Sequence, residues 1–234
     1  MLKIFDEIQK NLLNTLFPVF CNGCNKLLLK NENVICTKCL HHLPLTHHHT
    51  IKNTEIDQTF YGLVPFEFGA AILYFNKKGI SQNLIHNLKY RNRQEIGTYL
   101  GDLYAKELSN IETIKTIDYI IPVPLHQKRF HERGYNQVIT FCKSIEKNLT
   151  IPMLDDVLVK TQHLKSVTDK SKEGRLAHNK NVFSIENQHK IEGKHILLVD
   201  DVFTTGATIE SCAKEILKIK NTKISILTMA YSKL

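Results

Sequence analysis

Two adjacent aspartates followed by a threonine- and glycine-rich run form the pattern with the most chemical content in this chain. Asp200 and Asp201 follow an unbroken apolar stretch, Ile196 to Val199, which predicts a strand covered on both faces of a parallel sheet and ending at the aspartates. Open α/β sheets bind their ligands at this end of their strands. A helix is predicted to start directly afterwards, and its first residues offer backbone N–H groups and hydroxyls: Thr204, Thr205, Gly206, Ala207 and Thr208. Such a start binds phosphate through its N–H groups and the positive end of the helix dipole.

A ligand that uses both parts of this pattern has a vicinal diol and a phosphate. The two carboxylates can accept hydrogen bonds from the 2′- and 3′-hydroxyls of a ribose, while the loop encloses a 5′-phosphate. The pattern is similar to the phosphoribosyl pyrophosphate (PRPP) motif of type I phosphoribosyltransferases. The alternative is a buried strand, a helix-capping threonine loop and two solvated aspartates. Adjacent carboxylates at the end of an apolar strand are costly without cationic partners, which favours the ligand site.

Two C-x-x-C motifs near the N-terminus predict a metal site. Cys21 and Cys24 form the first motif, Cys36 and Cys39 the second, with eleven residues between them. Together they offer four thiolates in the tetrahedral arrangement of a closed, structural zinc site, and a short hairpin over 27–35 fits the gap. The alternatives are reduced thiols or a redox pair, but redox pairs rarely come doubled outside a βαβ unit.

The other cysteines and the nearby histidines are given no ligand role. Cys142 and Cys212 lie in apolar helical surroundings and are expected in the core. Five histidines are expected to form an exposed, incidental run: His41, His42, His47, His48 and His49.

The composition is ordinary for a globular protein. The chain has 234 residues, 42% hydrophobic and 23% charged, enough for one α/β domain and a small appendage. A net charge of +8 favours polyanionic or phosphorylated partners. No apolar run approaches the length of a membrane span, and Asp6 and Glu7 interrupt what would be the apolar core of a signal peptide. We therefore expect a cytoplasmic protein.

The predicted elements alternate between strands and helices, which indicates an α/β fold with a mainly parallel sheet. An amphipathic helix over 1–16, the cysteine module and a polar linker over 46–59 form a predicted first domain, 1–59, and the α/β domain covers 60–234. A polar, basic stretch over 158–181 is expected to be a mobile loop. Strands are predicted over 64–68, 70–75 and 118–123, with 223–230 closing the sheet, and helices over 80–90, 95–108 and 135–145.

Four motifs in this order resemble the ComF/ComFC family of competence-associated proteins. They are the paired C-x-x-C motifs, the sequence Leu-Lys-Tyr-Arg at 88–91, the proline- and arginine-containing segment 122–137, and the V-D-D-V-x-T-T-G-A-T loop. The resemblance runs from about Phe17 to Tyr231. It implies a type I phosphoribosyltransferase fold with a small N-terminal zinc-ribbon module, and a link to DNA uptake in natural competence.

The resemblance also implies where the pyrophosphate of PRPP would lie. The loop after the 118–123 strand would face it, and Lys128, Arg129 and Arg133 would bind its oxygens. A solvated basic turn is the alternative. The 160–179 segment corresponds to the flexible loop that closes over the site, with Lys160, Lys172 and Arg175 as its candidate contacts.

The implied chemistry is displacement of pyrophosphate from C1 of PRPP by a nitrogen nucleophile. Mg²⁺ would bridge the ribose diol and the pyrophosphate, while Asp200 and Asp201 would hold the diol and favour positive charge on the sugar. No convincing general base is found, because His126 and His131 are interpreted as polar loop residues.

Two other functional classes remain open. The first is a non-catalytic module that senses PRPP or a nucleotide and binds single-stranded DNA through basic segments such as 89–93. The second is an adaptor whose zinc head docks another protein, for example a competence or recombination protein.

Overall fold

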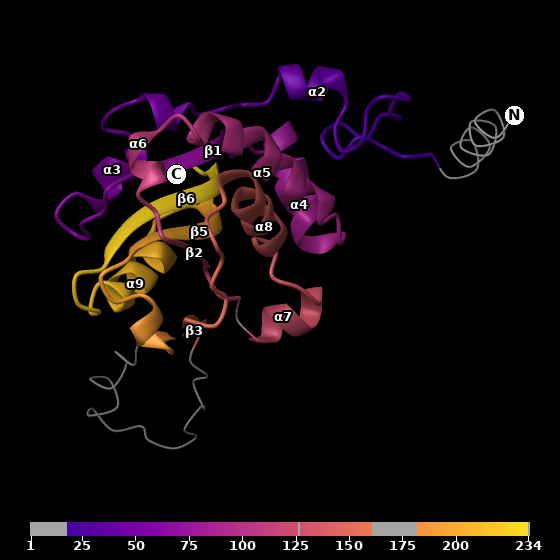
Figure 1. Ribbon diagram of the computed structural model, residues 1–234. Helices are drawn as coiled ribbons and strands as arrows, with labels where there is room; N and C mark the ends of the chain where they lie inside the picture. Colours follow the sequence, from indigo (N-terminus) through magenta and orange to yellow (C-terminus); the bar gives the residue numbers. More distant parts are fainter. Residues whose placement is uncertain (1–17, 126, 161–181, 234) are drawn as a thin grey trace, which may run out of the picture.

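A parallel four-stranded sheet flanked by helices forms the centre of the computed structural model, which describes residues 18–125, 127–160 and 182–233 (Figure 1). The strand order is β1-β6-β5-β2, and β3 and β4 form a separate antiparallel pair. The strands are β1 (Gly69–Tyr74), β2 (Tyr119–Pro122), β3 (Leu158–Lys160), β4 (Phe183–Ile185), β5 (His195–Phe203) and β6 (Lys223–Tyr231). The α/β prediction is therefore confirmed.

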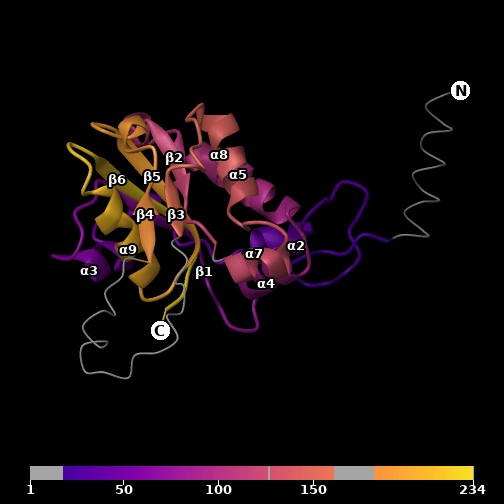
Figure 2. The same ribbon diagram turned by 90° about the horizontal axis from the view of Figure 1, so that it is seen from below.

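Helices cover both faces of this sheet. The α-helices are α2 (Thr37–His41), α3 (Glu55–Phe60), α4 (Ile80–Tyr90), α5 (Glu95–Leu108), α6 (Glu112–Lys115), α7 (Gln127–Arg133), α8 (Ile139–Leu149) and α9 (Ala207–Ile216), and the 3₁₀ turns are η1 (His48–Thr50) and η3 (Gln188–Lys190). Figure 2 shows α9 on one side of the sheet and α5 and α8 on the other. No helix within the described residues is long and apolar enough to cross a membrane.

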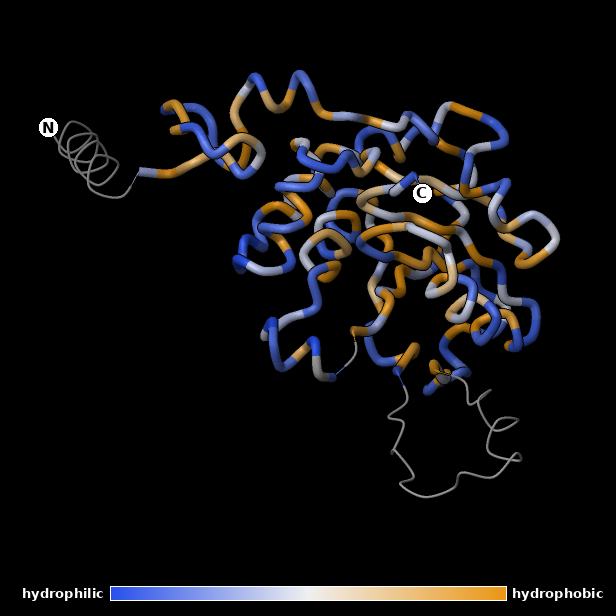
Figure 3. The backbone as a smooth tube through the Cα atoms, turned by 180° about the vertical axis from the view of Figure 1, so that it is seen from behind, coloured by the Kyte–Doolittle hydropathy of each residue, from blue (hydrophilic) through white to orange (hydrophobic). Residues whose placement is uncertain are grey.

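The apolar residues of β5 alternate between two cores because successive side chains of a strand point to opposite faces. Leu197 and Val199 pack with α4, α5 and α8, whereas Ile196 and Leu198 pack with α3 and α9. Most residues of β5 and β6 are accordingly apolar, and orange segments gather at the centre of the molecule in Figure 3. The unbroken apolar run in the sequence thus marked a strand buried on both faces, as predicted.

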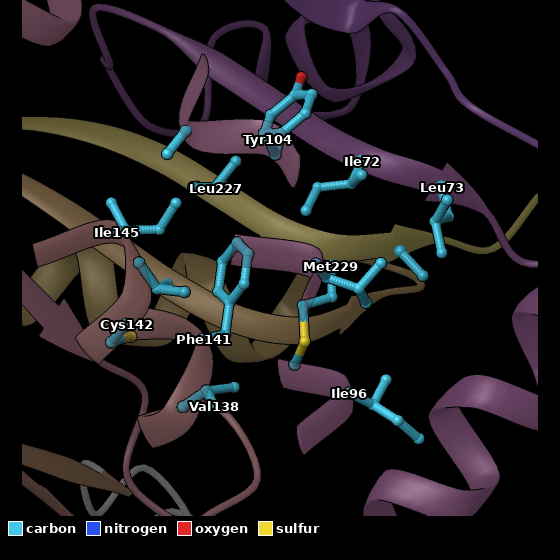
Figure 4. Close-up of a cluster of buried hydrophobic side chains, with 14 of the residues drawn as sticks. Ile72, Leu73, Ile96, Tyr104, Val138, Phe141, Cys142, Ile145, Leu227 and Met229 are labelled. Atoms are coloured by element: carbon cyan, nitrogen blue, oxygen red, sulfur yellow. The ribbon is translucent and has the colours of Figure 1, made fainter. Parts of the chain in front are cut away.

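The first core is packed tightly where α5 and α8 cross. Phe141 of α8 and Tyr104 of α5 lie against Leu227 and Met229 of β6 (Figure 4). A Cβ atom at Gly101 of α5 would lie 2.6 Å from the side chain of Ser144 in α8, so only glycine permits this approach. Cys142 and Cys212 are both fully buried, as predicted.

Several predicted elements differ from the structure. Residues 64–68 form no strand and instead reach β6 through single hydrogen bonds from Glu67 N and to Phe68 O. Strand β6 does not close the sheet but lies inside it, between β1 and β5. The helix predicted from Tyr135 begins at Ile139, after α7, a helix that was not predicted. The hairpin expected over 27–35 is replaced by turns, with one bridge between Phe20 and Leu27.

The segment 46–59 is not a polar linker, as it was predicted to be. Thr54 begins α3 with a capping box in which its hydroxyl accepts from Asp57 N and its own N–H donates to the Asp57 carboxylate. Ile56 and Phe60 are then buried in the second core. The polar residues of this segment satisfy the ends of a short helix, so polarity alone misled the prediction. The helix predicted for 1–16 lies outside the described residues.

Candidate functional site

A cavity of about 510 Å³ lies at the carboxyl ends of all four parallel strands. Its wall includes a residue at or just beyond the end of each strand: Phe75 for β1, Val123 for β2, Thr204 for β5 and Ser232 for β6. Helix α4 and the segment leading into α7 complete the wall. This is the edge at which α/β sheets bind ligands. The residues predicted from the sequence that line it are Asp200, Asp201, Thr204, Thr208, Arg129 and Lys160.

The two aspartates lie inside β5, not at its end as predicted. Strand β5 continues to Phe203 because β6 runs beside it, pairing Asp200 with Thr228. On the other side β2 has already stopped, since its last pair joins Pro122 to Val199. The aspartates therefore project past the end of β2 into a crevice between neighbouring strands.

Asp201 is nearly buried and is held by two side chains from other elements. Its side chain is 10% exposed, and the ammonium of Lys89 in α4 lies 2.9 Å from Oδ2. Gln137 donates a second hydrogen bond to the same oxygen. A buried carboxylate needs such partners to stay charged. Lys89 was not among the residues predicted for this site, because its partner Asp201 lies 112 residues away in the sequence.

Asp200 has a strongly perturbed ionisation. Burial and the neighbouring charge of Asp201 raise the pKa of Asp200 to about 7, although the Asp201 N–H and the charges of Lys89 and Lys160 act in the opposite direction. The Asp201 N–H donates to Oδ1 of Asp200 at 2.7 Å. Two carboxyl groups of different character therefore lie side by side in the cavity wall.

The threonine-rich loop forms the predicted start of a helix. Gly206 is the residue before α9 and has a left-handed backbone, with φ of 78°. A Cβ atom there would lie 2.9 Å from the ring of Phe203, so both the conformation and the space require glycine. Thr204 and Thr208 line the cavity, whereas Thr205 and Ala207 are exposed beside it.

The basic residues predicted for pyrophosphate take different places. Arg129 of α7 lines the cavity and Lys128 belongs to the same helix, whereas Arg133 is not among the cavity residues. Instead Arg133 donates to Gln137 at 2.7 Å and lies over the ring of Tyr90, 5.1 Å from its centroid. It therefore acts on Asp201 through Gln137.

The predicted flexible loop contributes one described residue. Lys160, at the end of β3, lines the cavity, and burial and the charge of Arg129 lower its pKa. Lys172, Arg175 and His126 lie outside the described residues.

The four cysteines form the second candidate site. Their sulfur atoms all lie within 4.8 Å of one another, and Cys24 Sγ and Cys36 Sγ are 3.7 Å apart. Zinc–sulfur bonds of about 2.3 Å in a tetrahedron require sulfur separations of about 3.8 Å. The cluster could therefore hold a metal ion such as zinc.

Backbone N–H groups support thiolates in this cluster. Gly23 N and Cys36 N donate to Cys21 Sγ at 3.3 and 3.2 Å. Although burial opposes ionisation, N–H groups of Cys36, Cys24 and Gly23 hold the pKa of Cys21 at about 7. A thiolate is the form that binds metal.

The histidine run is only partly exposed. His41, His42 and His47 are exposed, but His48 is buried, with its Nδ1 accepting from Ala71 N at 3.3 Å and its Nε2 3.0 Å from a carboxylate oxygen of Glu55. The prediction was wrong for His48 because β1 gives its ring a polar partner inside the protein. It was also wrong for His49, whose side chain is 8% exposed and lies 2.9 Å from the Tyr104 hydroxyl.

Comparison with known proteins agrees with this architecture. Residues 139–233 match the phosphoribosyl transferase domain family. The chain is 27% identical to DNA utilization protein YhgH of Shigella flexneri over 201 residues, which are 85% of this chain and 84% of that protein. It is 29% identical to Competence protein F of Haemophilus influenzae over 151 residues, 63% of this chain and 66% of that protein. It is 25% identical to Competence protein ComFC of Bacillus subtilis over 214 residues, 91% of this chain and 84% of that protein. The chain thus has the type I phosphoribosyltransferase fold, and over most of its length it is similar to competence and DNA-utilization proteins of the ComF/ComFC kind.

Proposed function

We propose that this protein binds PRPP with Mg²⁺ in the cavity at the carboxyl edge of the sheet and acts in the handling of DNA taken up in natural competence. The main support for the proposal is that one cavity is lined by two aspartates, by the start of α9 and by two basic side chains, Arg129 and Lys160. The names of the relatives, which refer to DNA utilization and competence, support the biological setting.

The cavity offers a separate place for each part of PRPP. The ribose diol would bind at Asp200 and Asp201, and the 5′-phosphate at the 204–208 loop. The pyrophosphate would lie toward Arg129 and Lys160, whose charges match its oxygens. Mg²⁺ supplied with PRPP would offset the charge of the pyrophosphate.

If turnover occurs, the bond between C1 and the pyrophosphate oxygen breaks and a nitrogen nucleophile bonds to C1. The pyrophosphate leaves with the bonding electrons, so positive charge develops on the sugar. An ionised Asp200 would stabilise this charge, and Arg129 would stabilise the leaving group.

Titration calorimetry with PRPP and Mg²⁺ tests the binding. Asp200→Asn combined with Asp201→Asn should weaken binding at least tenfold, because it replaces one acceptor oxygen of each carboxyl group by an NH2 donor and removes the negative charge. The exposed neighbours Asp155 and Asp156 allow a control, since Asp155→Asn with Asp156→Asn makes the same two substitutions outside the cavity. Equal affinity for wild type and the cavity double variant would refute the site. Pyrophosphate release with candidate nitrogenous bases then separates an enzyme from a sensor.

We also propose that zinc is the metal of the four-cysteine cluster and is structural, because four cysteine sulfurs supply all four positions of a closed tetrahedral site.

A specific observation favours single-stranded DNA as a second ligand. Tyr90, at the edge of the cavity, is 65% exposed, and Phe130 of α7 is 48% exposed. Exposed rings beside cations are the surfaces on which unpaired bases stack, at about 1–3 kcal/mol per base. Gel-shift titrations at two salt concentrations, with and without PRPP, test this. We expect retardation that falls steeply with salt. No retardation at low salt would end the DNA hypothesis.

A further inference from the structure

Helix α4 lies beside the cysteine module (Figure 1) and also forms part of the wall of the ligand cavity. Its residues at one helical spacing, among them Gln82, His86 and Lys89, line the cavity. A different stripe of the same helix, Ile80, Asn83 and Asn87, faces the first cysteine turn. A single helix therefore forms part of the environment of both candidate sites.

Two side-chain amides fasten α4 to the cysteine turn. Asn83 Nδ2 donates to Gly23 O at 2.6 Å, and Asn87 Nδ2 donates to Asn22 O at 3.1 Å. Both acceptors lie in the two-residue turn between Cys21 and Cys24. The turn and the helix are also in direct contact, since a Cβ atom at Gly23 would lie 3.0 Å from both Ile80 and the sulfur of Cys39.

The turn that accepts these bonds is shaped by the cysteine sulfurs. Gly23 N donates to Cys21 Sγ, and Asn22 donates both its backbone N–H and its side-chain amide to Val34 O. A metal ion that ties the sulfurs together would fix the directions of the Asn22 and Gly23 carbonyls. Without the metal ion, these two carbonyls would be held less firmly, and the hydrogen bonds from Asn83 and Asn87 would restrain α4 less.

The same C-terminal half of α4 also reaches Asp201 in the cavity wall. Lys89 follows Asn87 by two residues and makes the 2.9 Å ion pair with Asp201. Leu84 and Leu88 hold the helix in the core, so a loosened turn would increase its motion and not release it. More motion in α4 would weaken the contact between Lys89 and Asp201.

We propose that Asn83 and Asn87 are positioning residues that couple the four-cysteine module to the cavity, so that metal binding at the cysteines raises the affinity for PRPP. This inference rests on the proposed function because it takes PRPP with Mg²⁺ as the ligand and zinc as the metal. Neither asparagine lines the ligand cavity. Because coupling is reciprocal, PRPP must in turn strengthen metal binding by the same factor.

A double-variant cycle tests the coupling in the full-length chain. PRPP affinity is measured by calorimetry, in excess Mg²⁺, for zinc-loaded and zinc-stripped forms of wild type and of Asn83→Ala with Asn87→Ala. We expect stripping to weaken PRPP binding about tenfold in wild type, within the usual range of site coupling, and less than twofold in the double variant. Alanine favours helix, so the variant should keep α4 and its four cysteines intact. Gln58→Ala in α3, which removes an exposed amide elsewhere, is the control.

Two further measurements do not depend on the affinity cycle. PRPP should slow the transfer of zinc to a competing chelator in wild type but not in the double variant. Hydrogen exchange should become faster in α4 of wild type when zinc is removed, and be equally fast in the double variant with or without zinc.

The outcomes separate this inference from the proposed function. If PRPP does not bind but exchange in α4 follows the metal through Asn83 and Asn87, the proposed ligand is wrong and the link from the cysteines to α4 stands. If PRPP binds with an affinity that does not respond to zinc, or responds equally in both proteins, the coupling is overturned.

Discussion

The ammonium of Lys89 lies 2.9 Å from a carboxylate oxygen of Asp201, which joins α4 to β5 at the wall of the cavity. Both side chains are largely buried, with 19% and 10% of their surface exposed. Removing one partner of such a pair leaves a charge in a poor environment, which costs more than the pair itself contributes. The positive charge of Lys89 thus offsets the cost of placing two adjacent carboxyl groups in the partly buried cavity wall.

Replacing Lys89 should therefore affect stability and binding together. Lys89→Met keeps much of the side-chain volume but removes the charge, and we expect a loss of about 1–3 kcal/mol in the free energy of unfolding. PRPP affinity should fall about tenfold because Asp201 loses its fixed position. Urea unfolding and calorimetry measure the two effects. Lys143→Met on the exposed side of α8 is the control, and equal stability of the two variants would contradict the role of the pair.

The raised pKa of Asp200 makes stability depend on pH in a definite direction. Its pKa of about 7 in the folded protein lies above the value of about 3.9 for an unfolded aspartate. Between these values the folded state binds more protons than the unfolded state, so stability falls as pH rises from about 4 to about 7. Asp200→Asn should remove this fall and be more stable than wild type above pH 7. Chemical unfolding at pH 4, 6 and 8 checks it, and parallel curves for both proteins would contradict the assignment.

The cysteine module can be tested without loss of its helix cap. Cys36 is the N-cap of α2, and Cys36→Ser keeps an acceptor for the Cys39 N–H while removing a metal ligand. We expect one zinc per wild-type chain and a large loss of zinc affinity in the variant, with faster hydrogen exchange over 18–45 and little change in β5 and β6. Thr37→Ser is the control. Wild-type protein without zinc and with four freely titrating thiols would refute the metal site.

The spacing of apolar residues correctly predicted those helices and strands whose buried face can be read from their own sequence. The bounds of α4 and α5 agree with the predicted ranges, because apolar residues repeat at helical spacing between clear ends. The segment 64–68 was mistaken for a strand because its apolar residues, such as Val64 and Phe66, pack beside the sheet without pairing along it. The position of β6 between β1 and β5 depends on pairing with a strand far away in the sequence, and the sequence of β6 alone does not indicate it.

In the candidate site, too, the residues that are close in sequence could be predicted and the contacts between distant segments could not. The motif around Asp200 and the four cysteines was visible because neighbours in sequence remain neighbours in space. Lys89 and Gln137 reach Asp201 from distant segments, so their partner could not be inferred from their surroundings. The contacts of Arg133 with Gln137 and Tyr90 could not be predicted for a related reason, since a cation in a basic turn has several possible partners.

Gly206 allows the phosphate-binding role of the loop to be tested separately from general stability. Its φ of 78° disfavours any residue with a side chain by about 1 kcal/mol or more, and a Cβ atom would lie 2.9 Å from the Phe203 ring. Gly193 has φ of 68° but nothing within 4 Å of an added Cβ atom, so Gly193→Ala carries the backbone strain alone. We expect Gly206→Ala to be the less stable variant, by about 1–3 kcal/mol, because the contact with the ring adds to the strain.

The two variants should differ even more in ligand binding. In the Gly206→Ala protein, the start of α9 would have to shift to relieve the contact with the ring. This shift would turn the backbone N–H groups of the 204–208 loop away from their present directions. Gly193, in contrast, does not line the cavity. Gly206→Ala should therefore bind PRPP at least tenfold more weakly than wild type while Gly193→Ala binds with unchanged affinity. Thermal unfolding and calorimetry on the same preparations measure both properties. Unchanged PRPP affinity in a folded Gly206→Ala protein would mean that the phosphate does not bind at the start of α9.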